Sequence, residues 1–217
     1  KKAMQPFGYF NPTLQSSLTQ KNQQWKITFN IQAGQAIKIT QIDLKIIGAG
    51  QQDPAFQKFY SHMPIKIGRP LHTEDYEKTK QLLYDLASTR GYFDAKMQAS
   101  KIRINIEKHQ AKIIIHFQTG PRYRFGKTTL NPSPFAKSFL RRFLKYKQGK
   151  PYNYQRIEKT QKGFIDSNFF SQVIINPVQD NITDDEAPIQ IKTVPQKRYA
   201  YSLGLGYGTD TGPRATA

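Results

Sequence analysis

Cysteine is absent from the sequence, which excludes disulfide bridges and thiolate metal sites. A reducing cytosol and a disulfide-free periplasm are both compatible with this absence, so it assigns no compartment. The sequence also lacks a secretory signal and any apolar run of about 18 residues or more, so we expect no membrane-spanning helix. A mature or shortened chain would show the same absences.

Acidic residues are scarce: 15 Asp and Glu face 33 Lys and Arg, for a formal net charge of +18. This excess attracts nucleic acid, anionic lipid headgroups or acidic proteins without choosing among them. The basic residues are spread along the chain. Because the chain is 37% hydrophobic, with 12 Tyr and 14 Phe, we expect folded domains with small cores.

A repeat of about 80 residues organises the chain. Asp53-Pro54, followed by Tyr60, returns as Ser133-Pro134, followed by Leu140 at the matching position. Asp or Ser caps a helix N-terminus, and Pro suits the first helical position because its missing N–H needs no partner there. The sequence therefore predicts that a helix begins at each of these motifs.

A second helix in each repeat is predicted by the Gly-x-Pro motifs at 68–71 and 149–152. Its first copy ends at Gly91, where glycine adopts the left-handed conformation easily, and Asn168 takes that place in the second copy. The second copy is shorter by about one helical turn. In the first copy the apolar stripe that faces a sheet consists of Tyr76, Leu83, Leu86 and Ala87.

Two extended runs follow each helix pair, as at 97–107 and 112–118 in the first full copy. Apolar residues alternate in the first run, and the second contains the continuous run 113–115, which is typical of a central strand. The unit is therefore strand, helix, helix, strand, strand, in the α+β class. We predict a partial copy at 1–33, complete copies at 34–118 and 119–195, and a different segment at 196–217.

The last segment alternates strictly between 199 and 208, with small residues at every second position. A transmembrane β-strand needs about 9–11 residues with apolar side chains toward lipid, although an ordinary sheet strand fits the pattern as well. The predicted lipid-facing residues are Tyr199, Tyr201, Leu203, Leu205 and Tyr207.

The stretch 206–214 resembles the first barrel strand and following turn of the TamA family, which is related to BamA. The residues that carry this resemblance are Gly206, Tyr207, Gly208, Thr209, Asp210, Gly212, Pro213 and Arg214. The two full repeats resemble the POTRA domains of that superfamily, although Asn168 departs from the usual glycine. The resemblance implies tandem POTRA domains, each a three-stranded mixed sheet with two helices on one face, before a barrel that is cut off after its first strand.

The resemblance further implies a non-enzymatic arm in the periplasm of a Gram-negative bacterium, attached to the outer membrane. Its expected partners are unfolded outer-membrane proteins such as autotransporters, a TamB-like inner-membrane-anchored subunit and an anionic phospholipid surface. No cofactor and no nucleic acid are expected. A two-partner-secretion transporter, which normally carries two such repeats, and a basic nucleic-acid-binding module remain the alternatives.

An open sheet edge is the predicted binding site, because a small sheet with helices on one face leaves an edge strand able to pair with an extended chain. We expect this edge in the second strand of each unit. In the later copy Pro177 weakens the edge, because proline has no N–H to donate to a pairing strand. An edge that stays unpaired and is protected by its basic residues is the alternative. The predicted contact residues are Lys96, Gln98, Lys101, Arg103, Asn105, Gln172 and Ile174.

Catalytic and metal-binding patterns are absent from the sequence. The four histidines, at 62, 72, 109 and 116, have no metal-like spacing, and the acidic stretch 180–186 lacks the ligand pattern of a calcium loop. Aromatic residues interleaved with basic ones, at 123–125 and 146–147, have the composition of a base-stacking surface. We expect core or hinge positions for them instead.

Overall fold

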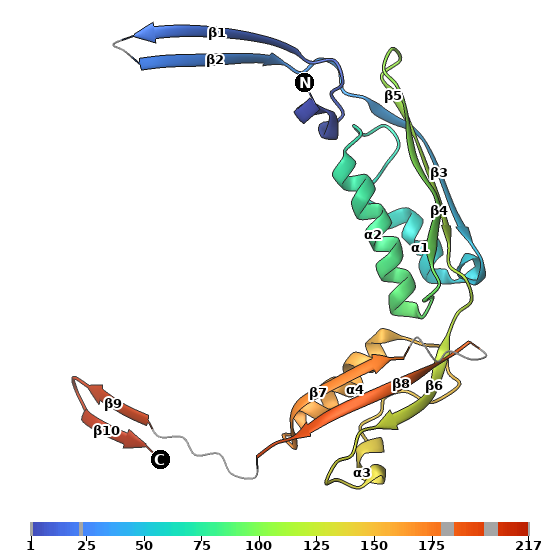
Figure 1. The fold of residues 1–217 in the computed structure, drawn as a ribbon, viewed down its shortest axis with the longest axis vertical. Coiled ribbons are helices and arrows are strands. Elements are labelled where there is room, and N and C mark those ends of the chain that lie inside the picture. Colours follow the sequence, from blue (N-terminus) through green and yellow to red (C-terminus); the bar gives the residue numbers. More distant parts are fainter. Residues whose placement is uncertain (1, 22–23, 179–184, 198–203, 217) are drawn as a thin grey trace. The chain divides into compact units, whose positions relative to one another are not determined.

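The structure is a computed structural model that describes residues 2–21, 24–178, 185–197 and 204–216. The chain forms two compact units: unit 1 comprises 1–124 with 151–154, and unit 2 comprises 125–150 with 155–217. Figure 1 shows the helices and strands of both units. None of the helices in the described ranges is long and apolar enough to cross a membrane.

Unit 1 is built around a mixed three-stranded sheet in the order β3-β5-β4. Strand β3 is parallel to β5, and β4 is antiparallel to it, so β5 is the central strand, as predicted. Both helices cover one face of this sheet (Figure 1). The elements are β3 (Lys38–Ile47), η2 (Ala49–Gln52), α1 (Pro54–His62), α2 (Thr73–Arg90), β4 (Lys96–Asn105) and β5 (Gln110–Gln118).

The core of unit 1 lies between α2 and the sheet, where Leu83, Ile113 and Phe117 are fully buried. Burial of one such side chain contributes about 1.5–3 kcal/mol. The predicted helix signals are confirmed: the Asp53 carboxylate accepts a hydrogen bond from Ala55 N–H at 3.0 Å, and Gly91 ends α2 with φ 83°. These local signals set where the helices begin and end.

The N-terminal part of unit 1 contains η1 (Lys2–Phe7) and a hairpin of β1 (Thr13–Lys21) and β2 (Gln24–Gln32). The alternating apolar residues of β2 are all exposed, including Trp25 at 63% and Phe29 at 60%. They lie on the same face as Leu14 and Leu18 of β1. The apolar face of this hairpin is therefore uncovered by the described residues, and the assignment of 1–33 to a partial copy stays a prediction.

Unit 2 repeats the arrangement, with its sheet in the order β6-β8-β7. The shorter second helix is confirmed, since α4 has 13 residues where α2 has 18. Asn168 has φ 59° and replaces the glycine in the left-handed position, as predicted. The elements are β6 (Arg124–Leu130), α3 (Lys137–Arg141), α4 (Tyr154–Asp166), β7 (Phe170–Pro177) and β8 (Glu186–Pro195).

The predicted start of the first helix in unit 2 is wrong. Helix α3 begins at Lys137 after Ala136, and Ser133 only accepts a long hydrogen bond, 3.4 Å, from Phe135 N–H. Phe135 packs against the rings of Phe139, Phe169 and Phe170, and this contact holds the chain in a loop where the first helical turn was expected.

The C-terminal segment forms a separate hairpin of β9 (Gly204–Gly208) and β10 (Gly212–Thr216). Tyr199, Tyr201 and Leu203, which were predicted to face lipid, lie outside the described residues. The assignment of this segment to a membrane strand therefore stays a prediction.

Candidate functional site

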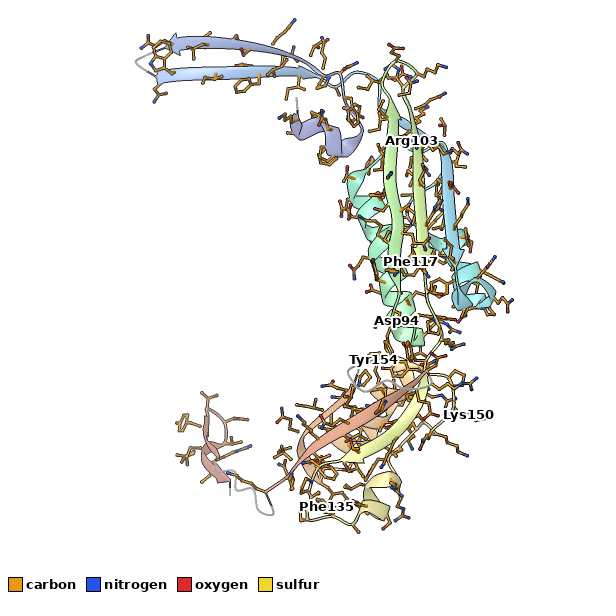
Figure 2. All side chains as sticks on the ribbon, turned by 45° about the vertical axis from the view of Figure 1, so that its right-hand side comes forward. Asp94, Arg103, Phe117, Phe135, Lys150 and Tyr154 are labelled. Carbon is orange, nitrogen blue, oxygen red and sulfur yellow. The ribbon has the colours of Figure 1, made fainter. Side chains whose placement is uncertain are left out.

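The sequence-predicted contact residues of the first full repeat all lie on β4, which is an edge strand. Its alternate residues Ile102 and Ile104 pack against the core, and this packing turns the other set outward. Figure 2 labels Arg103 on this strand. The exposed residues are Lys96, Gln98, Lys101, Arg103 and Asn105, of which Gln98 donates a side-chain hydrogen bond to Gln118 at 2.7 Å.

One backbone group of the β4 edge is already occupied. The N–H of Met97 donates to the hydroxyl of Tyr84, which lies on α2, at 3.0 Å. The Tyr84 ring packs edge-on against Phe117 at 5.2 Å, so the hydroxyl is held in place. Tyr84 thus covers one end of an otherwise accessible strand.

The matching edge in unit 2 is β7, where Gln172 and Ile174 are exposed. This edge is more protected than β4. Gln161 of α4 donates from its side-chain amide to the carbonyl of Val173 at 2.9 Å, and the strand ends at Pro177, which has no N–H to offer.

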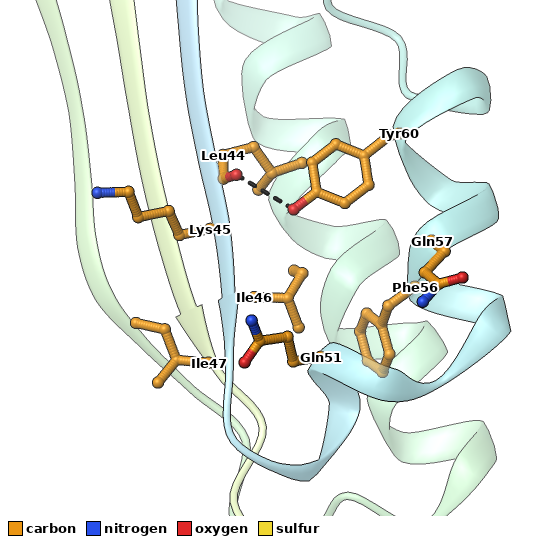
Figure 3. A pocket seen from close by; sticks show the side chains of 8 residues that line it. All are labelled: Leu44, Lys45, Ile46, Ile47, Gln51, Phe56, Gln57 and Tyr60. Carbon is orange, nitrogen blue, oxygen red and sulfur yellow. Dashed lines mark hydrogen bonds between the residues drawn. The ribbon is translucent and has the colours of Figure 1, made fainter.

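The other edge of the unit 1 sheet, β3, was missed from the sequence. The hydroxyl of Tyr60, on α1, donates to the carbonyl of Leu44 at 3.1 Å, as Figure 3 shows. Burial raises the pKa of Tyr60, and a backbone hydrogen bond from Ile46 partly offsets this rise. The available signal was the repeat itself, because Tyr60 aligns with Leu140, an apolar residue that is 1% exposed.

Two pockets adjoin Tyr60 between β3 and α1. The pocket that includes Ile46 and Phe56 has a volume of about 300 Å³ (Figure 3), and the pocket that includes Met63 and Ile67 has about 390 Å³. Both contain mainly apolar side chains. Such concave apolar surfaces accept apolar side chains of a partner.

The strongest electrostatic feature of unit 1 is the buried carboxylate of Asp53. It accepts hydrogen bonds from Arg90 Nε at 2.7 Å and Tyr92 Oη at 3.0 Å, and Arg122 lies 3.5 Å away. Burial alone would raise the pKa of Asp53, but the hydrogen bonds from Arg90, Ala55 and Tyr92 lower it overall. Burial together with the Asp53 carboxylate raises the pKa of Tyr92 to about 12. This cluster ties α1 to the residues after α2 and β5.

A second, more open pair lies between β3 and β5. His116 Nε2 is 3.2 Å from Asp43 Oδ2, and this hydrogen bond is the main cause of the lowered pKa of Asp43. Within the described ranges no three His, Asp or Glu residues gather as metal ligands, and 180–184 lie outside those ranges.

The predicted aromatic and basic stretches do not form a base-stacking surface. Tyr123, Phe125 and Tyr146 are each no more than 6% exposed. Phe125 stacks on Tyr146 with ring centroids 4.3 Å apart. Their rings are therefore packed inside the fold, as expected of core positions.

The predicted barrel-start motif forms the β9–β10 hairpin and its turn. Leu205 is 92% exposed and Tyr207 78% exposed, so neither side chain is covered by the described residues. Tyr207 pairs with Pro213, and Gly206 with Arg214. The remaining motif residues lie in or beside the turn, where Gly212 has φ 69°: Gly208, Thr209, Asp210 and Gly212.

Comparisons with known proteins agree on one class. Residues 1–33 match the family model of POTRA domain 1 of TamA, and 56–120 match the POTRA model described as a surface antigen variable number repeat. The structure resembles BamA POTRA domains 3–5 from Haemophilus influenzae, with TM-score 0.52 and 18% identity over 87% of this chain and 74% of that one. It also resembles BamA from Haemophilus ducreyi lacking POTRA domains 1–3, with TM-score 0.60 and 22% identity over 81% of this chain.

The fold defined by these units is that of POTRA domains, each a small mixed sheet with helices on one face. Two stretches of the chain, 1–33 and 56–120, match POTRA family models, and the structure shares the POTRA fold with the two BamA structures. The two matched stretches and the shared fold agree with the resemblance stated from the sequence. The chain spans 32% of the Haemophilus ducreyi BamA structure.

Proposed function

We propose that this chain belongs to the periplasmic arm of a TamA-like factor that binds extended client polypeptides and aids insertion or secretion of outer-membrane proteins such as autotransporters. The observation that supports this function best is the exposed edge strand β4. An edge strand presents N–H and C=O groups that pair with an incoming strand. The role is binding and positioning, without a chemical step.

The proposed contacts are on β4 and, more weakly, on β7. Exposed Lys101 and Arg103 give the β4 edge a positive charge that suits acidic client segments, in keeping with the net charge of +18. The β7 edge is the weaker candidate because Gln161 and Pro177 restrict it.

The hairpin β9–β10 is proposed as the start of an outer-membrane barrel. Its exposed Leu205 and Tyr207 have the apolar and aromatic character of a lipid-facing strand. The match of 1–33 to POTRA domain 1 of TamA supports a TamB-like subunit as partner. The positive charge supports contact with anionic phospholipid.

Site-specific photo-crosslinking tests the client-binding proposal. A benzophenone amino acid replaces Arg103 or Gln172, and the probe is a urea-unfolded outer-membrane barrel protein diluted into buffer. The control position is Lys162 on α4, whose side chain is 77% exposed and which is not part of a strand. We expect strong crosslinks at 103, weaker ones at 172 and background at 162, whereas equal yields at all three positions would contradict an edge-strand site.

Co-sedimentation with phosphatidylglycerol vesicles tests the lipid contact. Binding should fall when salt rises from about 50 to 300 mM, because screening weakens contacts between exposed charges. Salt-insensitive or absent binding removes this part of the proposal. A gel-shift titration that shows tight binding to nucleic acid at physiological salt would favour the alternative function.

A further inference from the structure

The first part of the β3 edge already pairs with an extended segment. Gly68 N–H donates to the carbonyl of Ile39 at 2.7 Å, and Ile39 N–H donates to the carbonyl of Arg69 at 2.9 Å. Leu71 N–H donates to the carbonyl of Ile37 at 2.8 Å. The outer side of β3 is therefore geometrically able to accept another backbone.

The second part of this edge is open except for Tyr60. The N–H and C=O of one strand residue point to the same side of the strand, and this side alternates from one residue to the next. Because the Leu44 carbonyl points outward to Tyr60, the backbone N–H and C=O groups of Ile42 and Ile46 also point outward. In the described part of the chain, no backbone hydrogen bond reaches 42–46 from that side. Tyr60 thus occupies a position that a pairing strand would take.

The two pockets beside Tyr60 suit the side chains of such a strand. In an extended chain, side chains on one face repeat every two residues, about 6.6–6.8 Å apart. One side chain would enter the pocket at Phe56 and another the pocket at Ile65. We call the open edge 42–46 with these two pockets the β3 groove.

The charges at the β3 groove select an acidic partner. Lys66 and Arg69 are exposed where the segment 66–69 borders the groove, and no acidic residue lines either pocket. Lys45 projects to the opposite side of β3 (Figure 3) and lies 3.9 Å from Asp43. Opposite charges at a rim guide a partner and favour its binding.

We propose that the β3 groove binds an extended polypeptide with apolar side chains at alternate positions and carboxylates beside them, in competition with the Tyr60 hydroxyl for the Leu44 carbonyl. This site rests on the proposed client-binding function and is separate from the β4 edge. Tyr60 keeps the groove closed to weak partners, because each guest strand must displace its hydrogen bond.

The test uses the full chain and a fluorescein-labelled decapeptide that alternates valine and serine between terminal aspartates. The variant Tyr60→Phe keeps the ring but frees the Leu44 carbonyl, so the decapeptide should bind about three- to tenfold tighter, the effect of one net hydrogen bond. The matched control is Tyr154→Phe, which removes the hydroxyl of a tyrosine on α4 that is 45% exposed, and its affinity should equal that of the unchanged protein. Tyr84→Phe, which frees the Met97 N–H, reports on binding at the β4 edge instead.

Hydrogen exchange locates the bound decapeptide. We expect slower exchange at 42–46, and loss of this protection when proline replaces the central valine or lysines replace the aspartates. Protection at 96–105 with a response to Tyr84→Phe, or protection on the β1–β2 hairpin, overturns the β3 groove but not client binding. Unchanged affinity in Tyr60→Phe overturns the competition. No protection anywhere, together with failed crosslinking at 103, overturns both proposals.

Discussion

The two POTRA repeats stabilise the same place in the fold by different means. In unit 1 the loop before the first helix carries Asp53, whose buried carboxylate contacts Arg90, Tyr92 and Arg122. In unit 2 the matching residue is Ser133, and the surrounding space is filled by phenylalanine rings instead. One topology therefore accepts either an ionic cluster or an apolar one.

The aromatic cluster of unit 2 has consequences for its helices. Its rings contact one another at centroid distances between 4.6 and 6.4 Å. Because the rings fill the space at the start of the first helix, α3 has only 5 residues, whereas the capped α1 has 9. The cluster consists of Phe135, Phe139, Phe143, Phe164, Phe169 and Phe170.

The largest expected effect is the loss of a central ring in unit 2. Phe164→Ala removes a fully buried side chain that lies 4.6 Å from Phe143 and 5.4 Å from Phe170, and should destabilise unit 2 by about 3–5 kcal/mol. Hydrogen exchange of α4 in denaturant measures this loss. Phe169→Ala is the control, since Phe169 is 46% exposed and should cost much less. If both substitutions lowered the stability of unit 2 equally, Phe164 would not be the central ring of the cluster.

A smaller loss of stability is expected when the ionic cluster of unit 1 is disrupted. Asp53→Asn removes the charge that Arg90 and Arg122 contact, and should destabilise unit 1 by about 1–3 kcal/mol. The partial exposure of both arginines keeps the cost at this level, because water replaces part of the contact. Exchange of α1 and α2 amides should accelerate while α4 is unchanged. Acceleration in both units would contradict separate stabilisation.

Acid should destabilise unit 1 more than unit 2. The pKa of Asp53 is lower in the folded protein than its ordinary value of 3.8, so the folded state binds fewer protons than the unfolded state. The stability from Asp53 is therefore complete above the ordinary pKa and is lost as pH falls through the lowered folded value. Exchange rates measured from pH 5 to 2 should show this loss in α1, and Asp53→Asn should abolish it. The Ser133 hydroxyl does not titrate there.

The smallest effect is expected at the matching position of unit 2. Ser133→Ala removes a side chain whose hydrogen bond to Phe135 N–H is long, so the free energy of unfolding should change by less than about 0.5 kcal/mol. Hydrogen exchange of the α4 amides at increasing urea concentration measures this change in the free energy of unfolding. A loss as large as that of Asp53→Asn would mean that Ser133 acts as a cap after all.

The proposed binding surfaces follow only partly from the sequence. The repeat topology predicted that its second strand lies at a sheet edge, and the structure has β4 at an edge with Lys101 and Arg103 exposed. Their role in binding stays a prediction. The β3 edge was missed because its features depend on Tyr60 meeting Leu44, which are on different elements. The protection of β7 by Gln161 was missed for the same reason.

By itself, the sequence determined the repeat, the strand and helix order, the Asp53 cap and the left-handed residues Gly91 and Asn168. These follow from neighbouring residues, because periodicity and capping act over a few positions. Only the tertiary structure decided where α3 begins, how Arg122 reaches Asp53 and which side chains close the sheet edges. Those outcomes depend on packing between distant segments, which local patterns do not encode.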